Sequence, residues 1–474
     1  MAFLVAVACS LGACRAEPAK NTLKLTRCHL SDTSGGERIA GECGTLSVPE
    51  NRASDSGRTV ELFVSVLRAT GSSPVADPVF LLAGGPGGAI SREFPKVAGF
   101  FGRLNVQRDL VLVDQRGTGR SHPLDCPKPQ HGLDESEVEL KVRLAACRAA
   151  LNVDLREYGT PQAIADLDAI RTALGYERIN LYGGSYGTRV ALAYARAYPA
   201  HLRSMILDGV VPYGLPLGPR IAQDSQRALD GVFARCTRDA ACSAAFPDLT
   251  GDLKTLLDRL TTPSLIGLAH PSTGELTHVA LSRRVAAGTI RMLSYASETA
   301  TLLPLLIHEG ARGNLSPLAA QALLAERMLD LQEGMHFSVI CSEDYPFFDR
   351  TATEGTYLDD LVIHEYQVAC DGWPRATLPP GFTEPVHSTV PTLLLSGELD
   401  PVTPPSNAEL ARATLPHSRE LVLAGEAHGV LHRGCVTRIA TEFLDQLTPA
   451  RLDLSCLAGH RPLPLFTSFK GPQP

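Results

Sequence analysis

The sequence predicts an α/β fold in which a mostly parallel sheet, covered by helices, is interrupted by a mainly helical insertion. Between residues 59 and 210, short aliphatic or β-branched runs alternate with helical patterns, which is typical of successive βαβ units. The alternation stops at Val211-Pro212, and the sequence is then predominantly helical in pattern to about residue 385. Strand patterns return at 392–395 and 420–423. Two separate parts of the chain are therefore expected to build one sheet.

The strands expected in the first part each run into a glycine or an aspartate, where a strand gives way to a loop. In open α/β sheets, the loops after the strands carry the chemistry. Strands are expected at 79–82, 110–113, 179–182 and 205–207, and helices at 135–150, 161–174, 187–197 and 432–446.

These patterns divide the chain into a discontinuous core and a cap. The 474 residues exceed one ordinary domain, which fits a single core that carries an insertion. Residues 28–211 are expected to form the first part of the core, 212–385 the helical cap and 386–460 the second part of the core.

Composition excludes several classes of partner. Hydrophobic residues make up 44% and charged residues 20% of the chain, as in globular proteins, and no run of 18 apolar residues predicts a membrane span. The formal charge is −7 and there is no long basic run, whereas nucleic-acid binding rests on clustered Lys and Arg. We therefore expect neither a nucleic-acid partner nor a membrane span.

The N-terminus predicts export. Residues 1–14 form a short apolar run that ends in small residues, as in a secretory signal. Leu11-Gly12-Ala13-Cys14 also resembles a bacterial lipoprotein box, in which the cysteine is acylated, but the basic segment expected before the apolar run is missing. A plain signal peptide and a lipid anchor at Cys14 both remain open. The mature protein is expected to be periplasmic, extracellular or lipid-anchored.

The cysteines agree with export. Of the twelve, Cys9 falls within the signal and Cys14 in the lipoprotein box, which leaves an even ten in the body. No C-x-x-C pair is present, and His428 with His432 lacks the Glu of a zincin motif, so no metal site is expected. Proximity in sequence suggests the disulfides Cys28–Cys43, Cys126–Cys147, Cys236–Cys242, Cys341–Cys370 and Cys435–Cys456.

A candidate nucleophile lies between a predicted strand and a predicted helix. Gly183-Gly184-Ser185-Tyr186-Gly187 has the G-x-S-x-G pattern in the strand-turn-helix context of a nucleophile elbow. The glycines let strand and helix approach while the serine Oγ projects above the sheet. The N–H of Tyr186 is then expected to face an oxyanion. This context predicts the α/β-hydrolase fold.

A glycine-rich loop, residues 84–88, follows the earlier strand at 79–82. This architecture takes its second oxyanion donor from that position, and we expect Gly85 to supply the N–H. The loop lacks the Lys-Ser/Thr ending of a P-loop and the spacing of a dinucleotide site.

The serine needs a base, and the base needs an orienting carboxylate. Asp400 follows the resumed strand and His428 lies in the loop after the last strand, which gives the chain order Ser, Asp, His expected of α/β hydrolases. His432 is a weaker candidate because it begins the following helix. Asp208 also ends a core strand and remains an alternative acid.

Five motifs together resemble the proline iminopeptidase and tripeptidyl aminopeptidase group: GGPGG (84–88), DQRGTGRS (114–121), GGSYGTR (183–189), GELDPVTP (397–404) and EAHG (426–429). Residues 43–49 and the segment with Cys435 especially resemble its secreted branch of tripeptidyl aminopeptidase-like proteins, and the likeness spans roughly residues 40–450. The resemblance places Ser185, Asp400 and His428 on catalytic positions, and Gly85 and Tyr186 on oxyanion positions. It implies an exopeptidase that acts at free N-termini. One departure is Ala83, where many relatives have His.

Three further features are open to two interpretations. Asp114 and Arg116, at a strand end, more often fix a loop than touch substrate. Glu343 and Asp344 of the cap are candidates for binding a substrate ammonium, although a solvated charged turn would look the same. Trp373, the only tryptophan, lines the pocket or packs beside a disulfide.

The sequence therefore predicts a secreted serine hydrolase without a cofactor, which cleaves short peptides or aminoacyl amides from a free N-terminus through an acyl-enzyme. An esterase or lipase acting on small esters is the alternative, because the same groups attack either carbonyl. An inactive hydrolase fold used as a binding module would predict a damaged triad, whereas all three residues are present.

Overall fold

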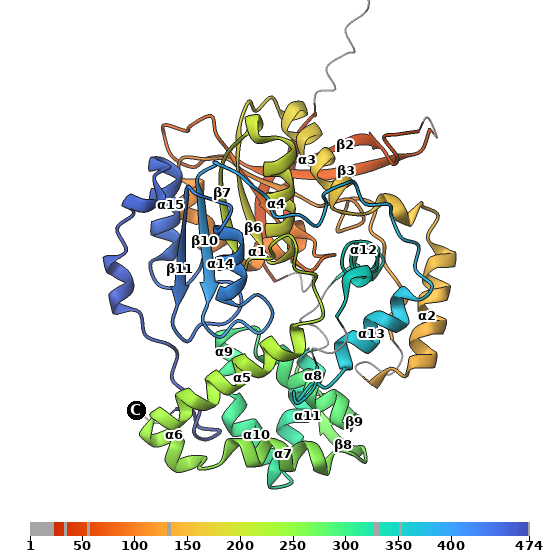
Figure 1. Cartoon of the computed structure of the whole chain (residues 1–474), viewed down its shortest axis with the longest axis vertical. Helices are drawn as coiled ribbons and strands as arrows, with labels where there is room; N and C mark the ends of the chain where they lie inside the picture. Colours follow the sequence, from red (N-terminus) through yellow and green to blue (C-terminus); the bar gives the residue numbers. More distant parts are fainter. Residues whose placement is uncertain are drawn as a thin grey trace, which may run out of the picture.

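A computed structural model describes residues 23–32, 36–54, 57–129, 134–325, 331–349 and 353–472. One large sheet lies between helices, and a further group of helices lies to one side of it (Figure 1). The predicted signal at 1–14 and the predicted lipid anchor at Cys14 lie outside the described residues. Within the described part of the chain, no helix combines the length and the apolar character needed to cross a membrane.

The sheet has nine strands in the order β1-β2-β3-β5-β4-β6-β7-β10-β11. The six strands from β5 to β11 in this order are parallel, whereas β1, β2 and β3 are antiparallel and form one edge. The mostly parallel sheet agrees with the predicted fold class. The strands are β1 (Thr26–Ser31), β2 (Arg38–Pro49), β3 (Thr59–Leu67), β4 (Val79–Leu82), β5 (Leu110–Val113), β6 (Ile179–Gly184), β7 (Leu202–Asp208), β10 (Thr392–Gly397) and β11 (Ser418–Leu423).

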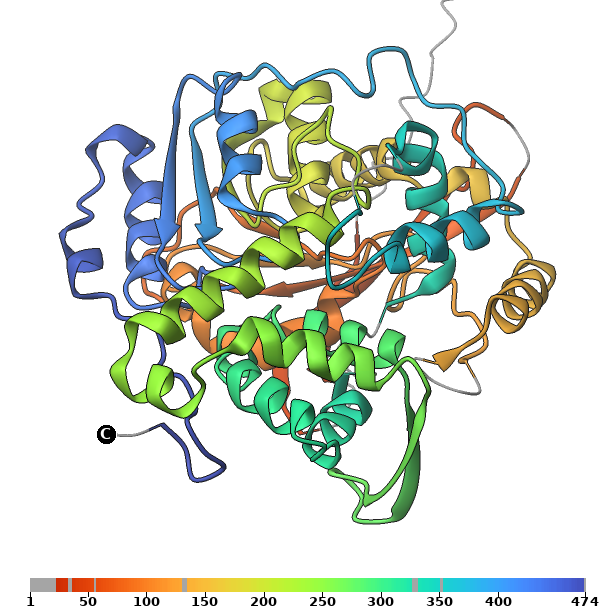
Figure 2. The same cartoon turned by 60° about the horizontal axis from the view of Figure 1, so that its bottom comes forward.

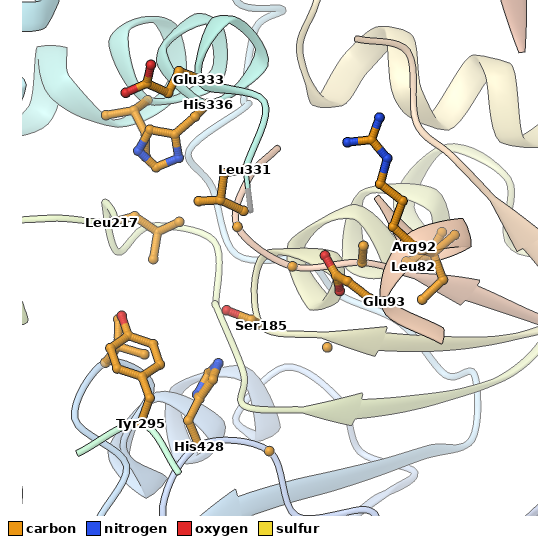
Figure 3. Close-up of a pocket in the computed structure, with 18 of the residues that line it drawn as sticks. Leu82, Arg92, Glu93, Ser185, Leu217, Tyr295, Leu331, Glu333, His336 and His428 are labelled. Carbon is orange, nitrogen blue, oxygen red and sulfur yellow. The ribbon is translucent and has the colours of Figure 1, made fainter. Parts of the chain in front are cut away.

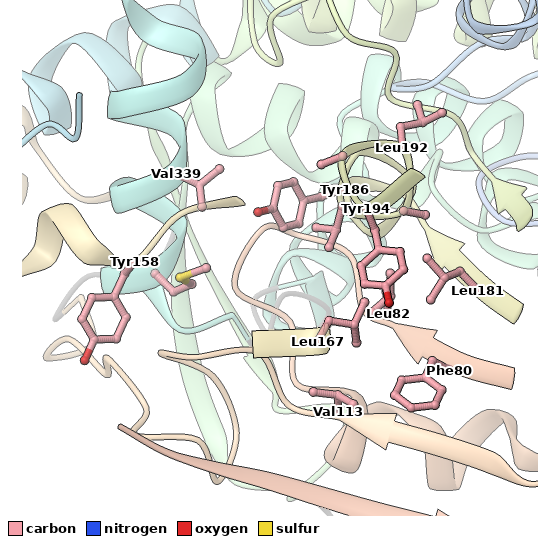
Figure 4. Close-up of a cluster of buried hydrophobic side chains, with 14 of the residues drawn as sticks. Phe80, Leu82, Val113, Tyr158, Leu167, Leu181, Tyr186, Leu192, Tyr194 and Val339 are labelled. Atoms are coloured by element: carbon pink, nitrogen blue, oxygen red, sulfur yellow. The ribbon is translucent and has the colours of Figure 1, made fainter. Parts of the chain in front are cut away.

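Both faces of the sheet are covered, which explains why its central strands are apolar throughout rather than alternating. Phe80 and Leu82 of β4 pack on one side with helices α3, α4 and α14, as Figure 4 shows in part, whereas Val79 and Leu81 pack on the other with α1 and α15. The helices are α1 (Ile90–Asn105), α2 (Glu137–Ala150), α3 (Thr160–Leu174), α4 (Tyr186–Ala197), α14 (Pro405–Arg412) and α15 (Val436–Gln446).

The chain between β7 and β10 is mainly helical. The part from α5 to α11 has a hydrophobic cluster of its own, whereas α12 and α13 pack with the core cluster (Figures 1 and 2). The hairpin of β8 and β9 was not predicted from the sequence. The elements are α5 (Ile221–Arg238), α6 (Ala240–Ala245), α7 (Leu249–Arg259), β8 (Ser264–Ala269), β9 (Leu276–Leu281), α8 (Arg283–Leu293), α9 (Ser297–Ala300), α10 (Leu303–Ala311), α11 (Ser316–Ala325), α12 (Glu333–Val339) and α13 (Leu361–Cys370).

The ten body cysteines form five disulfides, and every pair agrees with the prediction from sequence proximity. The bonds join Cys28 to Cys43, Cys126 to Cys147, Cys236 to Cys242, Cys341 to Cys370, and Cys435 to Cys456. Disulfides persist in oxidising compartments, so this set is typical of an exported protein.

Candidate active site

Ser185 lies between the end of β6 and the first residue of α4, with a positive φ of 54°. A non-glycine residue in this region stores strain, which the surroundings must hold. The Ser185 N–H donates to the carbonyl oxygen of Asp208 at 2.8 Å, which ties the turn to β7. A Cβ on Gly187 would lie 2.5 Å from the carbonyl oxygen of Leu82, so only glycine allows α4 to approach β4 this closely. The G-x-S-x-G pattern is therefore a strained elbow in the structure.

His428 and Asp400 meet at the ends of β11 and β10. Nδ1 of His428 lies 2.7 Å from Oδ2 of Asp400, which is buried. Asp400 also accepts hydrogen bonds from the backbone N–H groups of Val402 and Thr403, and from the Thr403 hydroxyl at 2.7 Å. This network fixes the carboxylate against the imidazole.

The two groups shift each other's pKa in opposite directions. Burial alone would raise the pKa of Asp400, but His428 and the hydrogen bonds to the carboxylate outweigh burial and hold this pKa below its usual value. Burial alone would lower the pKa of His428, but Asp400 outweighs it and raises this pKa. The pair thus favours an ionised carboxylate beside an imidazole that readily takes a proton.

Asp208, the alternative acid, occupies a different position. Its carboxylate accepts hydrogen bonds from the backbone N–H groups of Val430 and Leu431 and from the Tyr182 hydroxyl, at 2.8 to 3.1 Å. It makes no hydrogen bond to His428 within the described residues. Asp208 therefore supports the turn that carries His428, whereas Asp400 contacts the imidazole.

The glycine-rich loop lies directly against the elbow. A Cβ on Gly84 would lie 2.9 Å from the Cβ of Ser185, and the next peptide bond, Gly85-Pro86, is cis. Tyr186 is the first residue of α4, where a backbone N–H has no acceptor within the helix. Gly84, the neighbour of Gly85 in the chain, thus lies against the serine, and Tyr186 follows it directly.

Ser185 and His428 open into one cavity of about 1060 Å³ between the core and the helices inserted after β7. Figure 3 shows Glu333 and His336 on one side of this cavity, Tyr295 and His428 on the opposite side, and Ser185 between them. The cavity wall also carries charged groups from several elements: Arg92, Glu93, Asp125, Lys128, Arg291 and Glu365. Within the described residues, no cluster of three His, Cys, Asp or Glu side chains is placed to hold a metal ion.

Comparison with known proteins agrees with this arrangement. A family model described as α/β-hydrolase fold matches residues 77–245, which contain the elbow and the glycine-rich loop. The chain has the α/β-hydrolase fold. A second family model, described as TAP-like protein, matches residues 357–456 of this chain, which include Asp400 and His428.

Three curated relatives are similar to parts of this chain. The serine protease Hip1 of Mycobacterium tuberculosis is 32% identical over 224 residues, 42% of each chain. The tripeptidyl aminopeptidase of Streptomyces lividans is 30% identical over 189 residues, 36% of this chain and 35% of the relative. The proline iminopeptidase of Neisseria gonorrhoeae is 32% identical over 138 residues, 29% of this chain and 34% of the relative. The chain thus spans less than half the length of each of these relatives.

One contact of His428 was not predicted from the sequence. Its backbone N–H donates to the carbonyl oxygen of Tyr295 at 3.0 Å, and the two rings meet edge to face at 5.5 Å. Arg291 of α8 donates to the Tyr295 hydroxyl at 2.6 Å. Tyr295 follows α8, about 130 residues before the histidine in the chain, and no motif around it marks this role. The inserted segment therefore contacts the proposed base directly.

Glu343 and Asp344 do not lie where the sequence analysis placed them. Both are buried and neither lines the cavity. Glu343 accepts hydrogen bonds from the N–H and hydroxyl of Thr160, and Asp344 forms an ion pair with Arg189 at 2.9 Å. The expectation that these carboxylates bind a substrate ammonium is thus wrong in the structure, because other groups of the protein already occupy them.

The remaining two features have structural roles. Arg116 is fully buried and donates to Asp166 and to the carbonyl oxygens of Glu50 and Glu157, so it fixes loops. Trp373 is buried in the cluster that contains the Cys341–Cys370 disulfide, and its Nε1 donates to Ser338. Trp373 packs beside the disulfide and does not line the cavity.

Proposed function

We propose that this protein is an exported serine exopeptidase that hydrolyses short peptides or aminoacyl amides from a free N-terminus. The observation that carries the proposal is the contact of His428 with Asp400 beside the cavity into which the Ser185 elbow opens. The similarity to a serine protease, a tripeptidyl aminopeptidase and a proline iminopeptidase supports the same class.

In the proposed reaction, Ser185 attacks the substrate carbonyl while His428 takes the hydroxyl proton. Asp400 holds the imidazole tautomer and stabilises the imidazolium. The backbone N–H groups of Gly85 and Tyr186 stabilise the oxyanion. His428 then protonates the leaving amine, and the same groups activate water to hydrolyse the acyl-enzyme.

Recognition of a free N-terminus requires a carboxylate that no other group of the protein already binds. Glu333 is paired with Arg143, and Asp125 accepts from Gln332, whereas Glu365 makes no hydrogen bond or ion pair with the described residues. Burial raises the pKa of Glu365, because desolvation disfavours the charged form, while Arg284 and Arg291 oppose this shift. Of these three carboxylates, Glu365 of α13 is the one we assign to the substrate ammonium.

The test compares a short peptide amide with its N-acetylated twin. Acetylation removes the cation and leaves the carboxylate unpaired, so kcat/KM of the parent should favour the free peptide by about 30-fold or more. The variant Glu365→Gln should remove most of this preference, whereas Glu343→Gln should retain it. Equal rates for the twins in the parent would contradict the exopeptidase and favour an esterase or a general amidase. A preference that survives Glu365→Gln would place the amine at another group.

Five disulfides are typical of an oxidising compartment, and we infer on this basis that the mature protein works outside the cytoplasm. The choice between a periplasmic, an extracellular and a lipid-anchored form depends on the predicted signal. Mass spectrometry of the mature N-terminus after export separates acylation of Cys14 from simple cleavage.

A further inference from the structure

The glycine-rich loop that follows β4 is held from outside the core. The backbone N–H of Gln332 donates to the carbonyl oxygen of Gly87 at 2.9 Å, and Nδ1 of His336 lies 3.0 Å from the carbonyl oxygen of Pro86. Both donors belong to the start of α12, about 245 residues further along the chain. Two consecutive carbonyl groups of the loop are therefore bound by one short stretch of the inserted segment.

Packing shows that this contact is close. A Cβ on Gly87 would lie 2.8 Å from the carbonyl oxygen of Gln332, and a Cβ on Gly85 would lie 3.1 Å from Cδ2 of Leu331. The side chain of Gln332 also accepts from the N–H of Gly119 and donates to Asp125, both at 3.3 Å. The start of α12 is thus bound both to the loop and to the core segment that contains Gly119 and Asp125, and it leaves the loop little room to shift.

The chemistry of the contact fixes the tautomer of His336. A carbonyl oxygen can only accept, so the ring proton lies on Nδ1 and donates to Pro86. Burial lowers the pKa of His336 to about 4, although the bond to Pro86 opposes this shift. The imidazole is therefore neutral at neutral pH, and His336 acts as a directed donor rather than as a charge.

The bonds from α12 add to a single backbone bond within the loop among the described residues, from the Gly88 N–H to the Gly84 carbonyl oxygen at 3.1 Å. Ala83, the residue before the loop, has no polar side-chain atom that could bind it. An oxyanion donor acts only when its N–H is held at the position where the negative charge develops. The bonds to Pro86 and Gly87 therefore help to set the direction of the loop backbone.

We propose that His336 is a positioning residue that fixes the oxyanion loop from the inserted segment through its bond to Pro86. The inserted segment would then complete the catalytic machinery as well as enclose the substrate. This inference rests on the proposed function, in which Ser185 attacks a carbonyl beside this loop. His336 would act on the transition state through the loop, so its loss should lower kcat and change KM little.

Three variants distinguish the effect of losing the hydrogen bond from the effect of losing the volume of the ring. In His336→Asn, the side-chain amide takes the place of Nδ1 and can donate to Pro86. In His336→Gln, the amide is one bond longer and takes the place of Nε2, and His336→Ala removes the donor. His364→Ala is a matched control, because His364 lies on the neighbouring helix α13, contacts Glu137 and does not line the cavity.

The readouts are kcat and KM for an aminoacyl chromogenic amide, and the second-order rate of labelling by a small fluorophosphonate, whose phosphoryl oxygen uses the same donors. We expect His336→Ala and His336→Gln to lower both kcat and labelling by about 10- to 100-fold. His336→Asn should recover most of the loss, and His364→Ala should behave as the parent. Thermal unfolding of each variant shows that the compared proteins are folded.

Three outcomes would overturn the inference while the parent still labels. The first is unchanged rates in folded His336→Ala, and the second is equal rates in His336→Asn and His336→Gln. The second comparison holds even if the alanine variant does not fold. A rise in KM at unchanged kcat would also overturn it, because that result would make His336 a substrate contact. Absence of labelling in the parent would instead contradict the proposed nucleophile, so the two failures are distinguishable.

Discussion

His428 Nδ1 lies 2.7 Å from Asp400 Oδ2, while the second buried carboxylate of this region, Asp208, binds the backbone two and three residues after the histidine. The two aspartates thus orient His428 in different ways. Asp400 sets the tautomer and the charge of the ring, and Asp208 sets the path of the chain that carries it.

The variants Asp400→Asn and Asp208→Asn should therefore fail in different ways. Asp400→Asn keeps the shape but favours the wrong tautomer, so we expect kcat to fall by about 10⁴-fold with little change in stability. Asp208→Asn weakens the acceptor of buried N–H groups and should lower the unfolding temperature more than the rate. Steady-state kinetics and thermal unfolding of both variants check this. The opposite pattern would make Asp208 the orienting acid.

The pKa of His428 predicts the acid side of the pH profile. A base must be unprotonated to take the serine proton, so activity is lost as pH falls through this pKa. Because Asp400 raises the pKa, the midpoint should lie above 6.5. The rate of fluorophosphonate labelling against pH is the suitable measurement, since a peptide's own ammonium group titrates in the alkaline range. In Asp400→Asn the midpoint of the residual rate should move down, and an unmoved midpoint would contradict the assignment.

Ser185→Ala should abolish turnover while the fold persists, because the change removes one oxygen from the wall of the cavity. A fluorophosphonate probe should label the parent and leave the variant unlabelled, with matching circular dichroism spectra. Thr188→Ala is a useful comparison, because Thr188 lies one turn later in α4 and its hydroxyl donates to the Ser185 carbonyl. The Thr188→Ala variant should still be labelled by the probe. Equal labelling of parent and Ser185→Ala would move the nucleophile elsewhere.

Sequence patterns predicted the parts of the fold that depend on local chemistry. The apolar strands and the elbow at Ser185 can be located from the local sequence, because a buried parallel strand and a strained elbow each require particular residues over a few positions. The antiparallel strands β1, β2 and β3 were not among the predicted strands. β2 lies next to the edge strand β1 and largely alternates exposed and covered residues, and its pairing is decided by tertiary contacts.

The contacts from the inserted segment could not be predicted in the same way. Tyr295 accepts a hydrogen bond from the backbone of His428, and His336 donates one to the carbonyl oxygen of Pro86. In each pair the two residues lie more than one hundred positions apart in the chain, and neither Tyr295 nor His336 belongs to a motif. For Glu343 and Asp344, the sequence suggested a role that the folded chain does not support. Two adjacent carboxylates suggest a site for a cation, but the cation that Asp344 meets is Arg189 of the protein itself, which only the folded chain brings close.

The buried network of Arg189 and Asp344 predicts a stability defect rather than a change of specificity. Asp344 accepts from Arg189 at 2.9 Å and from the N–H of Leu217 at 2.7 Å, and it joins the chain after α12 to the helix that follows Ser185. Burial raises the pKa of Asp344, and Arg189 opposes this shift. Removing one partner of a buried pair costs about 3 to 5 kcal/mol when the other charge is left without compensation. Glu343 Oε2 also lies 3.9 Å from Arg189 and compensates part of its charge, so this range is an upper limit for Asp344.

Asp344→Asn should therefore lower the free energy of unfolding by at most about this amount and keep the kcat/KM ratio of free to acetylated peptide. Chemical denaturation, with the kinetic ratio measured at a temperature where the variant is folded, tests both parts. Glu365→Gln is the matched contrast, since it should change the ratio and leave the unfolding free energy almost unaltered. If Asp344→Asn instead abolished the preference for a free N-terminus at parental stability, Asp344 would reach the substrate and the pairing with Arg189 would not persist in solution.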